Sequence, residues 1–232
     1  MNNTDRSIAL LGLAAIATVG HGARGVQAAC SPIIHQHFGY QGRFFQDERL
    51  AKDSSMLANT FSHVIYVDTL DLDCDGQLDV AAQGVALPGP SPGRLVFQVW
   101  VRRGADWKPV LRSVSPVDGP EKIAIAAPLT SSQRRDLIVI GADEGGYVPR
   151  AFRWMGDSMV SVDVPPEYQL RNEPDWDATC ARKRNPRLVG RSEIALLRET
   201  ISPSSTRTHG ESCALPIDTL HIVGTHLMRV HP

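Results

Sequence analysis

Short apolar runs separated by polar turns recur along most of the chain. Residues 64–67 and 80–82 form the first two runs, on either side of an acidic loop. Residues 94–101 and 107–114 follow, joined by a turn at residues 103–106. Runs rich in β-branched and aromatic residues and bounded by Gly, Pro, Asp or Asn are typical of strands. The pattern therefore predicts two antiparallel hairpins, which together make a four-stranded unit.

The same order of elements returns further along the chain. A strand, a polar loop, a second strand and a hairpin are expected at residues 122–126, 131–135, 136–141 and 151–164. Residues 136–141 match residues 79–84 in pattern, and Asp136 follows Asp79 by 57 residues. Self-similarity at a fixed period indicates a repeat architecture. We therefore expect FG-GAP-like units, as defined below, at about residues 61–117 and 121–165.

A third apolar strand is expected one further period along, at residues 193–197, with two more at residues 219–223 and 227–230. A closed propeller of four-stranded blades usually needs at least four blades, and about 200 residues hold three or four at this period. The expected fold class is all-β, with four-stranded antiparallel units in a compact or incomplete β-propeller-like arrangement. The alternative is an antiparallel β-sandwich.

The first 29 residues have the character of a signal peptide. An apolar segment at residues 7–20 follows Arg6, and small residues stand near Ala28, where a signal peptidase would cleave. The segment is short for a membrane span. The alternative is a buried or anchoring N-terminal helix. We expect residues 30–232 to form a single β-rich domain that is periplasmic or secreted.

Four cysteines, Cys30, Cys74, Cys180 and Cys213, form an even set in a chain expected to be exported. Two disulfides are therefore expected, with three possible connectivities. We favour Cys30 with Cys74 and Cys180 with Cys213, although the spacing does not decide between the three. A lipid anchor on Cys30 is an alternative, but Gln27 stands where a bacterial lipobox prefers Leu.

The loop at residues 71–79 has the most specific chemistry in the sequence. Aspartates occupy its positions 1, 3, 5 and 9, as Asp71, Asp73, Asp75 and Asp79. Clustered carboxylates repel one another, and a hard divalent cation with oxygen ligands offsets that repulsion. Calcium fits better than magnesium because it accepts six to eight oxygens in flexible geometry. Gly76 supplies the turn, and the Gln77 carbonyl can add another ligand. The alternative is an acidic, solvated turn without an ion.

The loop is not an EF-hand, because Ala82 stands at position 12 and the flanking segments are strands. The pattern Asp-x-Asp-x-Asp-Gly-x-x-Asp, followed by an apolar strand and Gly84, resembles the FG-GAP or VCBS-type repeat of β-propeller blades. The resemblance implies calcium held by the aspartates and the Gln77 carbonyl: Asp71, Asp73, Asp75, Gln77 and Asp79. Cys74 departs from the usual residue at position 4, with its side chain expected to point away from the ion. Pro128, Thr130 and Ser132 replace three aspartates in the second unit, which is expected to be metal-free.

Catalytic constellations are not evident in the sequence. His221 and His226 are five residues apart on an expected strand and lack the Glu of a zinc-protease helix, and His35 and His37 lack partners at zinc spacing. Asp143 and Glu144 are adjacent, so along an extended chain they face opposite ways. We therefore expect a protein that is not an enzyme. A formal net charge of −1 also argues against a nucleic-acid partner.

The sequence thus predicts an exported, non-catalytic calcium-binding protein that acts by protein–protein recognition. In size and layout it also shows a weaker similarity to periplasmic lysozyme-inhibitor and immunity proteins, which implies a cell-wall hydrolase or secreted toxin as the partner. Alternatives are surface adhesion or glycan recognition, a structural subunit of an assembly, and a hydrolase. No membrane span is expected.

Overall fold

The computed structural model describes residues 30–35, 55–87, 93–131, 133–143, 146–169, 186–198 and 216–230. The expected signal peptide, Cys180, Cys213, His37 and Glu144 lie outside these residues. The described chain forms three antiparallel sheets and almost no helix, which confirms the all-β prediction. The described sheets do not close into a ring. Within the described ranges, no helix is long and apolar enough to cross a membrane.

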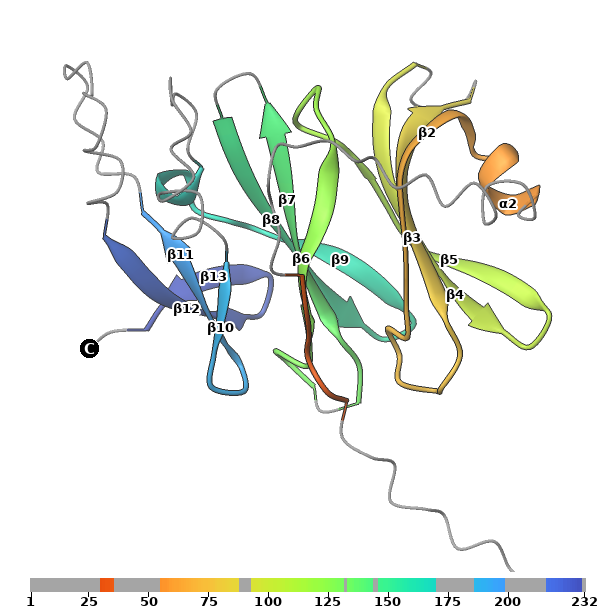
Figure 1. Ribbon diagram of the computed structural model, residues 1–232. Helices are drawn as coiled ribbons and strands as arrows, with labels where there is room; N and C mark the ends of the chain where they lie inside the picture. Colours follow the sequence, from red (N-terminus) through yellow and green to blue (C-terminus); the bar gives the residue numbers. More distant parts are fainter. Residues whose placement is uncertain are drawn as a thin grey trace, which may run out of the picture.

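Sheet 1 is a four-stranded meander in chain order (Figure 1). Its strands are β2 (Phe61–Leu70), β3 (Asp79–Ala86), β4 (Leu95–Arg103) and β5 (Asp106–Val114). Seven of the eight β3 residues are buried, because both faces of this central strand are covered. The short helix α2 (Ser55–Ala58) precedes β2, and its Leu57 packs on the face formed by Val80 and Trp100.

Sheet 2 repeats the meander and adds one strand at its edge. Its strands are β6 (Glu121–Ala127), β7 (Asp136–Asp143), β8 (Gly146–Met155) and β9 (Ser158–Val162). The added strand, β1 (Ile33–Ile34), pairs antiparallel with β6 through Ile33 opposite Ala126. The segment that follows Cys30 is thereby fixed to the second sheet, although the chain then returns to build the first.

Sheet 3 is a third four-stranded meander. Its strands are β10 (Arg187–Val189), β11 (Glu193–Leu197), β12 (Ile217–Val223) and β13 (His226–Arg229). The 3-10 helix η1 (Pro166–Tyr168) lies between β9 and this sheet along the chain. The apolar strand expected at residues 193–197 is β11, and it belongs to a full sheet and not to an isolated fragment.

Besides the cluster around Leu57 on sheet 1, the hydrophobic core has two layers, one on each face of sheet 2. Phe97 of sheet 1 stacks on Phe152 of sheet 2, with ring centroids 6.0 Å apart and planes 8° from parallel. On the other face, Ile138 packs with Ile194 and Leu220 of sheet 3. The three sheets therefore stack face to face in chain order, with sheet 2 in the middle (Figure 1).

Candidate metal centre

The acidic loop closes the hairpin between β2 and β3, where Leu70 pairs with Asp79. Gly76 turns the chain at φ 86°, a left-handed conformation that glycine adopts without steric cost. Cys74 also has a positive φ, 59°, which is uncommon for a residue with a side chain. The loop therefore holds a specific backbone shape around its carboxylates.

Three of the predicted ligands come together in this loop. One carboxylate oxygen from each of Asp71, Asp73 and Asp79 lies within 4.8 Å of the others. Calcium–oxygen distances are about 2.3–2.6 Å, so two oxygens bound to one ion lie at most about 5 Å apart. The three carboxylates are therefore close enough to share a single calcium ion.

Asp73 has one carboxylate oxygen without any partner. Its side chain is only 5% exposed, and its Oδ1 atom is buried and makes no hydrogen bond. Its Oδ2 atom accepts a hydrogen bond from Arg103 Nη1. A buried, unsatisfied polar atom costs free energy that a bound cation would recover. The three aspartates therefore leave a buried oxygen unsatisfied, and a bound cation would satisfy it.

Asp79 is fully buried and fixed by the backbone. Its Oδ2 accepts a hydrogen bond from the Leu72 amide at 2.7 Å, and its Oδ1 accepts one from the Arg102 amide at 2.9 Å. Burial raises the pKa of Asp79 to about 6, although these two hydrogen bonds oppose the rise. At neutral pH the carboxylate is therefore mostly ionised, and each oxygen keeps a lone pair for a cation.

Asp75 and Gln77 are placed differently from the first three residues. Asp75 is not in the group of converging carboxylates, and its two oxygens accept hydrogen bonds from Gln77 N at 2.8 Å and Gln77 Nε2 at 3.0 Å. Asp71 in turn accepts hydrogen bonds from the amides of Asp75 at 3.1 Å and Gly76 at 3.2 Å. Asp75 and Gln77 thus brace the turn in this structure.

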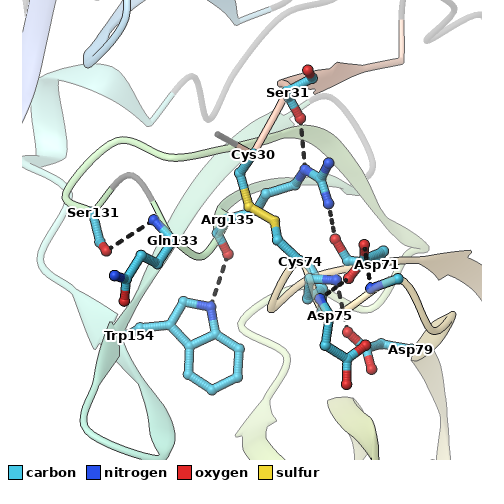
Figure 2. Close-up of a disulfide and its surroundings, with 12 residues drawn as sticks. Cys30, Ser31, Asp71, Cys74, Asp75, Asp79, Ser131, Gln133, Arg135 and Trp154 are labelled. Atoms are coloured by element: carbon cyan, nitrogen blue, oxygen red, sulfur yellow. Dashed lines mark hydrogen bonds between the residues drawn. A yellow bond between two sulfur atoms is a disulfide. The ribbon is translucent and has the colours of Figure 1, made fainter. Parts of the chain in front are cut away.

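A disulfide joins Cys74, inside the loop, to Cys30 at the start of the described chain (Figure 2). Their Cα atoms lie 5.8 Å apart, and 44 residues separate them in sequence. This pair is one of the two favoured from the sequence. A lipid anchor on Cys30 would need the same sulfur atom, so the anchor and the disulfide exclude each other. The Cys74 side chain points away from the carboxylates, as predicted.

No known protein family, curated protein or solved structure matches this chain.

Two arginines that the sequence did not reveal complete the site. Besides its bond to Asp73, Arg103 lies 3.5 Å from Asp75 Oδ2, and this acidic environment raises the pKa of its guanidinium. The buried Arg135 donates from Nε to the Ser31 carbonyl at 2.7 Å and from Nη1 to the Asp71 carbonyl. No motif identifies either arginine, because both reach the loop from distant parts of the chain.

Asp136 in sheet 2 reproduces the role of Asp79 with a different loop. Its Oδ1 accepts a hydrogen bond from the Trp154 amide at 2.9 Å, and its Oδ2 accepts from the Thr130 amide at 2.8 Å and the Thr130 hydroxyl at 2.7 Å. Thr130 lies six residues before Asp136, whereas Leu72 lies seven before Asp79. Thr130 therefore occupies the position of Leu72. The fixed period of 57 residues aligned Thr130 with Asp73 instead.

Two of the histidines considered from the sequence each lie beside a single aspartate. His35 Nε2 lies 3.3 Å from Asp68 Oδ2, and His226 Nδ1 lies 3.2 Å from the exposed Asp163. His221 lies on β12 opposite Met228. Within the described ranges, the group of three metal-ligating side chains is the aspartate cluster of the acidic loop.

Proposed function

We propose that this protein binds calcium in the acidic loop, through Asp71, Asp73 and Asp79. The observation that carries the proposal is the unpartnered Asp73 Oδ1, buried beside two converging carboxylates. Calcium supplies no chemistry beyond charge neutralisation here, and it stabilises the junction of β2 and β3. Its flexible coordination suits three carboxylates of unequal burial better than the octahedral demands of magnesium do.

We propose further that the sheets are blades of an incomplete propeller of the FG-GAP or VCBS type. Three meanders that stack face to face in chain order, with a buried aspartate at the start of β3 and of β7, support this reading over a sandwich. The Cys30–Cys74 disulfide supports an exported location, because disulfides persist in oxidising compartments.

The proposed role is recognition of another protein, with a secreted hydrolase or toxin as the partner class and no catalysis by this chain. The outer face of sheet 3 supports it. Alternate residues of β12 share this face, opposite the core, with their partners on β11 and β13 and with the β10 residues that pair with those of β11. Four of its apolar side chains are 38–49% exposed, namely Val189, Ile217, Val223 and Met228. Val223 and Met228 are diagonal neighbours across the β12–β13 pair, and they point away from the core. Neighbouring exposed apolar side chains of this kind support a contact with a partner protein.

Thermal unfolding with calcium and with a chelator tests the metal proposal. Calcium at a hundredfold excess over its Kd adds about 2.7 kcal/mol to the free energy of unfolding. For a domain of this size that corresponds to a Tm rise of about 5–10 °C. Asp73→Asn should lose most of this rise. The control is Asp106→Asn, which removes an exposed carboxylate on the β4–β5 turn and should keep it. Coincident wild-type curves with calcium and chelator would contradict the proposal.

Affinity capture of hydrolases and toxins from the same compartment tests the recognition proposal. The double variant Val223→Glu/Met228→Glu places charge on the outer face of sheet 3 and should lose the captured partner. Met155→Glu is the control, because Met155 is 51% exposed but lies at the end of β8 in sheet 2. If both variants retain the same partner, this face is not the recognition surface. Turnover of a glycan or peptide by the purified protein would instead favour a hydrolase.

A further inference from the structure

Three contacts join the acidic loop to segments of sheet 2. The Asp71 carbonyl accepts a hydrogen bond from Arg135 Nη1, and the Leu72 carbonyl accepts one from the Arg135 amide at 2.8 Å. Cys74 is bonded to Cys30. Arg135 comes from the loop that precedes β7, and Cys30 from the segment that precedes β1, so both anchors belong to sheet 2.

The two anchors are also connected to each other. Arg135 Nε donates to the carbonyl of Ser31, the residue after Cys30, at 2.7 Å. Figure 2 shows the arrangement, with Arg135 reaching Ser31 on one side and Asp71 on the other, and the disulfide running beside it. The Cys30–Ser31 segment and the acidic loop are therefore joined by one covalent link and one shared guanidinium.

Asp73 lies between these anchors in the chain. Leu72 on one side is held by Arg135, and Cys74 on the other is held by the disulfide at a φ of 59°. A left-handed conformation is costly for a residue with a Cβ, so it needs an external constraint. The disulfide supplies one at the residue that directly follows Asp73. The disulfide therefore fixes the backbone directly after Asp73, the residue with the unpartnered Oδ1.

We propose that the Cys30–Cys74 disulfide sets the calcium affinity of the acidic loop, which makes the loop a redox-responsive cation site. This inference rests on the proposed calcium site. With the disulfide intact, Asp73 is already oriented for the ion. When the disulfide is reduced, Asp73 becomes oriented only as the ion binds, and the free-energy cost of this ordering opposes binding. We therefore expect calcium to bind about tenfold more weakly, within the usual range of coupling between sites.

The reductant is a dithiol, as in thiol–disulfide oxidoreductases or dithiothreitol. Its thiolate attacks one sulfur of the Cys30–Cys74 bond, a mixed disulfide forms, and the other sulfur leaves as a thiolate that takes up a proton. The second thiol of the reductant then attacks the mixed disulfide. Two electrons pass to the protein, which gains two thiols, and the reductant becomes a disulfide.

Linkage requires the reverse effect as well. If the oxidised loop binds calcium tenfold more tightly than the reduced loop, saturating calcium shifts the dithiol–disulfide equilibrium of Cys30 and Cys74 tenfold toward the disulfide. This second effect is measurable on the wild-type protein, without any substitution.

The first experiment is calorimetric titration with calcium chloride of the oxidised wild type and of Cys30→Ser/Cys74→Ser. The second is equilibration of the wild type in dithiothreitol redox buffers, with calcium or with chelator. Alkylation and mass spectrometry then quantify the thiols of Cys30 and Cys74 separately from the other cysteines. We expect about tenfold weaker binding by the variant and a tenfold calcium-dependent shift of the redox equilibrium.

Calcium binding by the wild type with equal affinity in the variant, or with no shift of the redox equilibrium, would overturn the coupling and leave the calcium site standing. Absence of binding by the oxidised wild type would overturn both. If the double variant does not fold, the redox equilibrium of the wild type decides alone.

Discussion

Asp73 shows how a single side chain can serve two cations. Its Oδ2 atom pairs with Arg103, and its Oδ1 atom has no hydrogen-bond partner among the described residues. The guanidinium partly neutralises the loop when no ion is bound, because it also lies 3.5 Å from Asp75 Oδ2. The same positive charge opposes the approach of a divalent ion. We therefore expect Arg103 to stabilise the loop without calcium and to weaken calcium binding at the proposed site.

Arg103→Met should consequently change two measured quantities in opposite directions. The free energy of unfolding in chelator should fall, because Asp73 loses its ion pair with Arg103. Calcium affinity measured by titration at low salt should rise about threefold to tenfold, because a positive charge near the ion is removed. Arg102→Met is the matched control, since the Arg102 side chain turns away to the Gly104 carbonyl and the Trp107 ring. Weaker calcium binding by Arg103→Met would show that Arg103 positions Asp73 and does not compete with the ion.

At the scale of elements, the buried aspartate that begins β3 and β7 joins three segments in each sheet. Its carboxylate accepts one amide from the preceding loop and one from the third strand of the meander. Each of these two strands also carries a glycine at its sixth residue, Gly84 in β3 and Gly141 in β7. A Cβ on Gly84 would lie 2.4 Å from the His63 carbonyl oxygen, and one on Gly141 would lie 2.7 Å from a methyl group of Val117. Both glycines therefore permit close packing against a neighbouring segment.

Substitution of these two glycines by alanine should give unequal effects. Gly84→Ala should lower the free energy of unfolding by about 2–3 kcal/mol, because the clash is with backbone and the bulged β2 strand must move. Gly141→Ala should cost less, because the Val117 side chain can change its rotamer. Urea unfolding of both variants measures the difference. A larger loss of unfolding free energy for Gly141→Ala than for Gly84→Ala would contradict the argument that a backbone neighbour yields less than a side chain.

At the scale of the whole molecule, sheet 3 is attached by its core face and by a buried polar group. Tyr168 in η1 donates its hydroxyl hydrogen to Asp218 Oδ2 at 3.0 Å, and Arg198 and Arg229 lie 3.0 and 3.1 Å from the same carboxylate. Burial and then the bond to Asp218 raise the pKa of Tyr168 to about 12. The segment between sheets 2 and 3 is thus fixed by a phenol that must stay protonated.

This raised pKa predicts a loss of stability at alkaline pH. The unfolded chain releases the Tyr168 proton near pH 10, whereas the folded protein keeps it until about pH 12, so the contribution of Tyr168 is complete below pH 10 and declines above it. Between pH 9 and 11 the stability difference between wild type and Tyr168→Phe should shrink by about 1.4 kcal/mol. Urea unfolding across this range measures it. A constant difference would show that the Tyr168 pKa is close to that of the unfolded chain.

The parts of this architecture that depend on local sequence could be predicted, and the parts that depend on distant contacts could not. The strands of sheets 1 and 2 follow from apolar runs and turn residues, and the acidic loop from its aspartate spacing. The strand β10 was missed because it is three residues long and pairs only through tertiary context. Arg103 and Arg135 reach the loop from 30 and 64 residues away, and no local pattern encodes such contacts.

The pairing of Cys30 with Cys74 has a consequence for the order in which the chain matures. These are the first and second cysteines of the sequence, so their loop encloses no other thiol. A polypeptide that emerges N-terminus first into an oxidising compartment presents both before Cys180 and Cys213 can compete. If the chain is exported as proposed, stepwise oxidation during translocation would yield the native bond without help from an isomerase. The bond would form before Ala126, the strand partner of Ile33, has emerged.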